Sequence, residues 1–224
     1  MAETVRFITA DGVEIVGDFL SAEPGAPVAL LLHMMPADRT SWRPFADRLL
    51  AAGYGSLAID LRGHGESVNQ GNRTLNYKQF GDAEHRASIR DVEAATAFLQ
   101  SRGVSPDRIV IIGASIGANL ALQYAREYAA IPAVALLSPG LDYRGVKTEP
   151  LVATLSPGQG ALLLASREDE YSFETIRTLA RAMGERVTKM EFDGLGHGTT
   201  MFERRPELMD EVIEWLKNVM KHET

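Results

Sequence analysis

Ser115 is the residue whose surroundings most clearly favour chemistry. It lies in Gly113-Ala114-Ser115-Ile116-Gly117, after an all-apolar stretch and before one with helical spacing. A serine on such a sharp strand-to-helix turn exposes its hydroxyl above the sheet, and the crowded backbone favours glycine two positions to either side. The pattern predicts a nucleophilic serine, and the alternative is a plain glycine-lined turn.

A serine hydroxyl is a poor nucleophile unless a base takes its proton. His197 lies in the glycine-rich loop Gly194-Leu195-Gly196-His197-Gly198, between the last predicted strand and the last predicted helix. We predict that His197 is the base, and the alternative is an exposed loop histidine. We assign no catalytic role to the other four histidines and interpret the first two as hydrogen-bonded loop anchors: His33, His64, His85 and His222.

The base in turn needs a carboxylate that holds its tautomer and stabilises the imidazolium. Asp169 follows the apolar run at 161–165 and is therefore expected at the same edge of the sheet as Ser115. Its alternatives are a solvated acid or the N-cap of the helix that follows. Glu168 and Glu170 are close rivals for the role, and Asp142 is a more distant one. We favour Asp169.

Short apolar runs alternate with amphipathic stretches along most of the chain. Asp11-Gly12 joins two apparent strands as a hairpin turn. Continuous apolar runs are typical of parallel strands buried on both faces. We therefore predict one α/β domain over 1–224, with about eight mostly parallel strands and helices on both faces. The predicted strands are 5–9, 14–20, 28–33, 54–60, 109–112, 133–137, 161–165 and 188–192, and the predicted helices are 41–52, 83–102, 116–128, 173–183 and 206–220.

With these three residues in this order, the chain resembles the α/β-hydrolase family, and in particular its small, lidless, esterase-like members. The order Ser115, Asp169, His197 is the order that this family uses. Leu31-Leu32-His33-Met34-Met35 resembles its oxyanion loop, and Asp60-Leu61-Arg62-Gly63-His64-Gly65-Glu66-Ser67 resembles the stretch after its next strand. The resemblance runs from the strand at Val28 to the last helix. We expect Arg62 and His64 to hold loops near the site by hydrogen bonds.

The resemblance also implies an oxyanion hole. One backbone N–H comes from the residue after the nucleophile, Ile116, and the other from the position that matches Met35. Met34 stands where the family usually has glycine. Met34 must then accept the backbone angles of a glycine, or the loop differs. Met34 and Met35 are candidate substrate-binding walls of the acyl pocket, and the alternative is that both are core contacts.

Composition excludes several other kinds of site. The 224 residues contain no cysteine, so the chain has no thiolate nucleophile, thiolate metal site or disulfide. No histidine pair has metal-ligand spacing, and no phosphate-binding or dinucleotide-binding glycine motif follows a strand. We expect no metal and no cofactor.

Charge and hydropathy narrow the partners. The net charge of −7 disfavours nucleic acid as a partner. The start of the chain has no signal-like pattern, and its apolar runs are too short to span a bilayer. We expect a cytoplasmic protein whose partner is a small ester and which contacts no membrane.

The reaction implied is acyl transfer through an acyl-enzyme, most simply by a carboxylesterase. Only 140–159 could form a cap, which is too short for several helices, so we expect an open site that takes small to medium esters. A peptidase, thioesterase or carbon–carbon hydrolase with the same triad is the alternative enzyme. Epoxide and halide chemistry is disfavoured because it needs an aspartate where Ser115 stands. A binding protein that keeps the hydrolase fold is the alternative outside enzymes.

Overall fold

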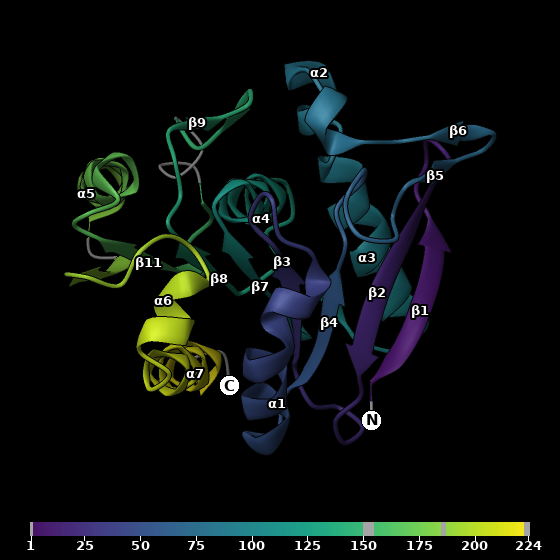
Figure 1. Ribbon diagram of the computed structural model, residues 1–224. Helices are drawn as coiled ribbons and strands as arrows, with labels where there is room; N and C mark the ends of the chain where they lie inside the picture. Colours follow the sequence, from purple (N-terminus) through teal and green to yellow (C-terminus); the bar gives the residue numbers. More distant parts are fainter. Residues whose placement is uncertain (1, 150–154, 185–186, 222–224) are drawn as a thin grey trace.

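A mostly parallel sheet forms the centre of the molecule (Figure 1). The computed structural model describes residues 2–149, 155–184 and 187–221. The longer strands are β1 Glu3–Ile8, β2 Val13–Leu20, β3 Val28–Leu32, β4 Gly55–Ile59, β7 Ile109–Ala114, β8 Ala133–Leu137, β11 Gly160–Ser166 and β12 Val187–Phe192. Their order is β12-β11-β8-β7-β3-β4-β2, with β1 beside β2. Neighbours from β12 to β4 are parallel, whereas β2 is antiparallel to both β4 and β1.

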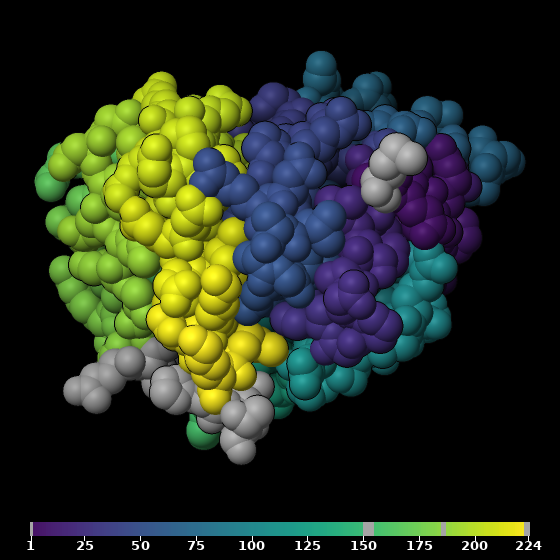
Figure 2. All heavy atoms as spheres, turned by 90° about the horizontal axis from the view of Figure 1, so that it is seen from below, coloured from purple at the N-terminus to yellow at the C-terminus, as the bar shows by residue number. Residues whose placement is uncertain are grey.

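Helices cover both faces of the sheet, as predicted (Figure 1). They are α1 Arg43–Ala51, α2 Asp82–Arg86, α3 Ile89–Ser101, α4 Ile116–Glu127, α5 Glu170–Met183, α6 Thr200–Arg204 and α7 Leu208–Lys221. α3, α4 and α5 pack on one face, and α1, α6 and α7 pack on the other. Figure 2 shows α7 in yellow beside α1 in blue on the lower side. No helix in 2–149, 155–184 or 187–221 is long and apolar enough to cross a membrane.

The strands supply alternate side chains to two separate core layers. In β3, Leu30 and Leu32 pack toward α3 and α4, whereas Ala29 and Leu31 pack toward α1 and α7. The same alternation recurs along β7 and β11. Because both faces are buried, these strands are apolar apart from Ser166 at the end of β11, which explains why they are recognisable in the sequence as unbroken apolar runs.

The predicted N-terminal hairpin is confirmed, and the predicted helix over 83–102 is wrong in one respect. β1 and β2 pair with Ile8 opposite Glu14 across the Asp11-Gly12 turn. The helix is interrupted at Ala87 and Ser88, so α2 and α3 are separate elements. There, Ser88 and Asp91 N–H groups donate to carbonyls three residues back, which tightens the turn and redirects the chain.

Two excursions rise beside the carboxyl edge of the parallel strands, at the top of Figure 1. One runs from β4 to α3 and includes α2 and the short strands β5 Asn69–Gln70 and β6 Arg73–Thr74. The other, after β8, contains the hairpin of β9 Asp142–Tyr143 and β10 Val146–Lys147. These short strands and α6 were not predicted. Residues 150–154 of the stretch considered as a cap lie outside the described residues.

Buried ion pairs hold the segment after β4. The carboxylate of Asp60 accepts hydrogen bonds from the backbone N–H groups of Arg39 and Glu66, both at 2.8 Å, and pairs with the Arg39 guanidinium. Gly65 makes this close approach possible, because a Cβ there would lie 2.1 Å from an Asp60 oxygen. The Asp60–Glu66 stretch is therefore folded around a buried carboxylate.

Arg62 links this segment to two others. Its Nε donates to Asp91 Oδ1 at 2.9 Å, and its guanidinium donates to both carboxylate oxygens of Asp11, at 2.7 and 3.0 Å. The expected loop-holding role of Arg62 is thus confirmed. Burial raises the pKa of Asp91 to about 6, although the Arg62 charge and hydrogen bonds oppose that rise.

We expect Arg62→Met to lower the free energy of unfolding at pH 7 by about 3–5 kcal/mol, because it leaves the fully buried Asp91 without its counter-charge. The measurement is urea unfolding followed by circular dichroism. Arg6→Met is the matched control: Arg6 pairs with Glu14 and Glu66, but its side chain is 47% exposed, so its loss should change stability by less than about 1 kcal/mol. Equal effects of the two substitutions would contradict this account.

Candidate functional site

Ser115 lies on a turn whose backbone excludes side chains at the two neighbouring glycines. It joins β7 to α4 with φ 54° and ψ −120°, a conformation that is rare outside glycine. A Cβ on Gly113 would lie 2.2 Å from the carbonyl oxygen of Gly117, and a Cβ on Gly117 would lie 2.3 Å from that of Leu32. The expected reason for both glycines is therefore confirmed.

His197 and Asp169 meet at the same edge of the sheet. His197 Nδ1 lies 2.6 Å from Asp169 Oδ2, and because a carboxylate only accepts, the imidazole donates. Burial would raise the Asp169 pKa, but the hydrogen bond from His197 and those from the Ser172 and Ser138 hydroxyls outweigh it and lower the pKa. Asp169 is therefore ionised near neutral pH. It stands at the start of α5, but its side chain does not cap that helix.

The rival carboxylates lie elsewhere. Glu168 accepts hydrogen bonds from the Ser166 hydroxyl at 2.7 Å and the Gly194 N–H at 2.8 Å, and a third from the Gly196 N–H. Desolvation raises the pKa of Glu168, but these hydrogen bonds together outweigh it and lower the pKa to about 2. Glu168 thus holds the backbone of the His197 loop. Asp142 accepts from the Gly145 N–H at 2.6 Å within the β9–β10 hairpin, and Glu170 is exposed in the first turn of α5.

Ser138 is a site residue that the sequence reasoning missed. It directly follows β8 with φ 50°, and its Oγ accepts from the Gly198 N–H at 2.9 Å. Its hydroxyl also interacts with Asp169. Ser138 thereby joins the loop of the base to the carboxylate. Its position immediately beyond a strand neighbouring that of Ser115 was the available signal.

The predicted oxyanion donors follow two neighbouring strands, β7 and β3. Ile116 is the first residue of α4, and first-turn N–H groups have no acceptor within their helix. Met35 follows β3, the strand that pairs with β7 on one side. Met34 does not adopt a left-handed conformation, because within 2–149, 155–184 and 187–221 only Ser115, Ser138 and Arg144 do so among residues other than glycine. The loop after β3 therefore differs in backbone conformation from one that has glycine in left-handed geometry at this position.

The two methionines of this loop face different layers. Met34 packs with the α1 and α7 layer, and its sulfur lies 4.0 Å from Thr199 Oγ1. The same sulfur is so close to Gly198 that a Cβ added there would lie 2.5 Å from it. Met35 packs with the α3 and α4 layer. Met34 thus supports the loop that carries His197, which favours the core-contact alternative for this residue.

His33 and His64 are buried loop anchors, as predicted. His33 Nδ1 donates to the Met34 carbonyl at 2.9 Å, and its Nε2 accepts from the Leu61 N–H at 3.0 Å. His64 Nδ1 donates to the Arg62 carbonyl at 3.1 Å, and its ring stacks on Tyr77 at 3.9 Å. Burial lowers both pKa values to about 4, so both rings are neutral at pH 7. His85 is buried in α2, and His222 lies outside the described residues.

The site is less open than expected. Ser115 is only 6% exposed, whereas the imidazole of His197 is 36% exposed. The β9–β10 hairpin reaches α2, since a Cβ on Gly145 would lie 2.7 Å from an Arg86 nitrogen. The two excursions therefore meet beside the site and narrow the approach to the serine.

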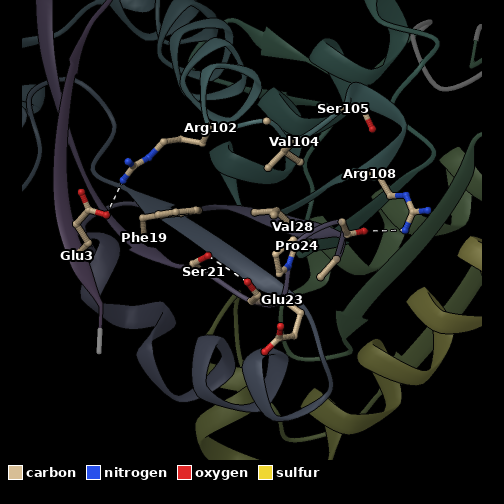
Figure 3. A pocket seen from close by; sticks show the side chains of 14 residues that line it. Glu3, Phe19, Ser21, Glu23, Pro24, Val28, Arg102, Val104, Ser105 and Arg108 are labelled. Atoms are coloured by element: carbon tan, nitrogen blue, oxygen red, sulfur yellow. Dashed lines mark hydrogen bonds and ion pairs between the residues drawn. The ribbon is translucent and has the colours of Figure 1, made fainter.

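A cavity of about 520 Å³ lies at the opposite, amino end of the parallel strands (Figure 3). Val28 and Ser105 line it where β3 and β7 begin. Its two arginines are already paired, Arg102 with Glu3 and Arg108 with the carbonyl of Gly25. The cavity is therefore separate from the catalytic candidates.

The chain matches the family model described as serine aminopeptidase, S33, over residues 27–168. Among curated relatives, the uncharacterised protein YfhR of Salmonella typhimurium is 26% identical over 189 residues, which cover 76% of this chain and 57% of YfhR. Epoxide hydrolase A of Mycobacterium tuberculosis is 42% identical over 66 residues, 30% of this chain and 20% of that protein. The chain thus spans a little over half the length of YfhR.

Among solved structures, the Pyrococcus furiosus esterase Pf2001 superposes with a TM-score of 0.79 at 21% identity, covering 98% of this chain and 91% of that chain. The α/β hydrolase GrgF from Penicillium sp. sh18 gives a TM-score of 0.79 at 15% identity, with 99% of both chains covered. These likenesses establish the fold.

The neutral state of His64 predicts a pH dependence of stability. Its pKa of about 4 in the fold is below the ordinary 6.5, so the unfolded chain binds more protons than the folded one between these pH values. The contribution of His64 to the free energy of unfolding is therefore lost as the pH falls from 6.5 toward 4. His64→Phe should reduce the loss of unfolding free energy between pH 7 and pH 4 by about 3 kcal/mol relative to wild type. Denaturant titrations at both pH values measure it.

Comparing His64→Phe with the wild-type protein cancels the contribution of Asp91 to the pH dependence of stability, because both proteins contain Asp91. That contribution has the opposite sign, since the pKa of Asp91 is raised. Tyr77→Phe is the control, since it keeps the stacked ring and the histidines and should retain the wild-type pH dependence. If His64→Phe behaves like Tyr77→Phe, the account of His64 is wrong.

Proposed function

The chain belongs to the serine aminopeptidase S33 family of α/β-hydrolases, and from that premise we propose that it is a serine hydrolase that cleaves small to medium carboxylic esters. The observation that carries the proposal is the 2.6 Å hydrogen bond between His197 and Asp169 at the edge of the sheet where Ser115 stands. The matched family residues include Ser115 and end one residue before Asp169. The pairing of base and acid is thus independent support from the fold.

In the proposed acylation, His197 Nε2 takes the proton of Ser115 as Oγ attacks the ester carbonyl. Asp169 accepts from Nδ1, which keeps the proton-free nitrogen toward the serine and stabilises the imidazolium. The carbonyl oxygen becomes an oxyanion held by the N–H groups of Ile116 and Met35, next to the positive end of the α4 dipole. Water then releases the acyl group by the same steps in reverse order.

The size of the substrate is inferred from what surrounds Ser115. The described parts of the two excursions supply two pairs of two-residue strands, β5–β6 and β9–β10, and the short helix α2. These short elements of the described residues narrow the approach to Ser115, which favours short acyl groups. Ser115 itself argues against epoxide chemistry, for which the fold would need an aspartate at this position.

A fluorophosphonate that reacts with activated serines should label the wild-type protein once per chain, and Ser115→Ala and His197→Ala should abolish the label. Ser101→Ala, at the exposed end of α3, is the control and should label normally. Intact-mass spectrometry measures the label. An unlabelled wild-type protein would mean a binding protein on this fold.

A substrate panel then separates the enzyme classes. Acetyl and butyryl esters should be cleaved faster than thioesters, aminoacyl anilides or long-chain esters of matched leaving group. A preference for aminoacyl anilides would mean a peptidase, and a preference for long chains would refute the inferred substrate size.

Replacing the acid should affect turnover far more than replacing its neighbour. Asp169→Asn should lower kcat by about 10⁴-fold, because the amide disfavours the required histidine tautomer. Glu168→Gln should cause a much smaller loss, because Glu168 bonds the backbone of the loop and not His197, and the amide oxygen still accepts from one of the two loop N–H groups. If the two variants lost kcat to a comparable extent, the assignment of the acid to Asp169 instead of Glu168 would be contradicted.

A further inference from the structure

Tyr143, at the end of β9, reaches back from the hairpin into the site. Its hydroxyl lies 2.9 Å from the Ser172 hydroxyl and 3.4 Å from the Ser138 carbonyl oxygen. It also interacts with the hydroxyl of Ser115. Its ring stands at 90° to that of His197, with 6.3 Å between the ring centres. One phenol therefore contacts His197, Ser138 and Ser172, and it lies near Ser115, whose N–H donates to the carbonyl of Leu137 next to Ser138.

The hairpin that carries Tyr143 is fixed at its base. Fully buried Asn119 from α4 donates to the carbonyls of Gly140 and Val146, at 2.9 and 2.7 Å, and accepts from the Gly140 N–H at 3.1 Å. A Cβ on Gly140 would lie 2.7 Å from the rings of both Tyr143 and Tyr171. The phenol is therefore held in place before any substrate binds.

The strand order determines from which side the phenol approaches. β7, which carries Ser115, lies between β3 and β8. Met35 follows β3, whereas Tyr143 follows β8. Tyr143 thus faces Ser115 from the side opposite the Met35 donor of the oxyanion hole and, with His197, borders the space that remains for the leaving group.

The phenol is available as a donor. Burial raises the pKa of Tyr143 to about 12, so it keeps its proton at neutral pH. Ser172 can donate to the phenol oxygen at 2.9 Å, so the phenol proton is held only by the long 3.4 Å bond to the Ser138 carbonyl and can turn toward a group bound at Ser115.

On the basis of the proposed function, we propose that Tyr143 is a further catalytic residue whose hydroxyl donates a hydrogen bond to the leaving oxygen of the ester. In the free protein the phenol donates to the Ser138 carbonyl oxygen at 3.4 Å. During acylation the Ser115 O–H bond breaks and its proton passes to His197, while Oγ bonds to the carbonyl carbon. When the bond between that carbon and the leaving oxygen breaks, His197 returns the proton to the leaving oxygen. Tyr143 keeps its proton and stabilises the charge that develops there.

The dependence on the leaving group tests this role. Tyr143→Phe should lower kcat/KM for the ethyl ester of a cleaved acid by about 100-fold. It should change kcat/KM for the p-nitrophenyl ester of the same acid only a few-fold, because that leaving group needs little stabilisation. kcat/KM is the parameter to compare, because it reports the acylation half-reaction and not the release of the acyl group.

Tyr171→Phe is the comparator. The Tyr171 hydroxyl accepts from the Asp142 N–H at 2.9 Å and donates to its carbonyl at 3.1 Å, so its removal loosens the same hairpin but keeps the Tyr143 hydroxyl. Any loss in Tyr171→Phe should be equal for the two esters. Equal losses for both esters in Tyr143→Phe, or no loss, would overturn the proposal.

Two further results separate the possible failures. If the wild-type protein takes up no phosphonate and cleaves neither ester, the proposed function fails. If it does both but Tyr143→Phe shows no leaving-group dependence, only the role of Tyr143 fails. Should Tyr143→Phe not fold, Ser172→Ala is the second variant, because it removes the hydroxyl that donates to the phenol. Its kcat/KM should also fall more for the ethyl ester than for the p-nitrophenyl ester, by a smaller factor. Equal losses for the two esters in Ser172→Ala would overturn the proposal.

Discussion

The close approach of three backbones at the start of α4 is the constraint on which the rest of the site depends. Gly113 touches the backbone of Gly117, and Gly117 touches that of Leu32, so α4 begins directly against the ends of β7 and β3. Side chains at either glycine would push the helix away from the sheet. This contact brings the Ser115 hydroxyl, the first N–H groups of α4 and the loop after β3 to one place.

The loop that carries His197 is held by residues that follow three different strands. Glu168 after β11 binds the N–H groups of Gly194 and Gly196, Ser138 after β8 accepts from Gly198, and Met34 after β3 packs against the same residue. The loop glycines Gly194, Gly196 and Gly198 all have positive φ, which lets the chain turn tightly enough to present its N–H groups to these partners. The position of His197 is thus a property of the whole carboxyl edge of the sheet.

Buried charges fix the segment after β4, on the other side of the site. Asp60 and Arg39 hold the start of the first excursion, and Arg62 ties it to Asp11 and Asp91. His33 joins this segment to the loop after β3, because it bonds both Leu61 and Met34 while remaining neutral. The polar residues of the Asp60–Ser67 stretch that drew notice in the sequence are therefore structural in this fold.

The sequence by itself determined the sheet, because strands buried on both faces must be apolar throughout, and it determined the serine turn, because only glycine fits beside it. It also placed Asp169 and His197 just beyond strand ends. Only the tertiary structure decided which carboxylate meets the histidine, since Glu168 and Asp169 are adjacent in the chain and differ in the side to which they point. The break between α2 and α3, the Ser138 contact and the reach of Tyr143 into the site were decided there too. The contacts of Ser138 and Tyr143 depend on distances between residues far apart in the chain, about which periodicity carries no information. The break between α2 and α3 is a local tightening of the turn that the apolar spacing does not reveal.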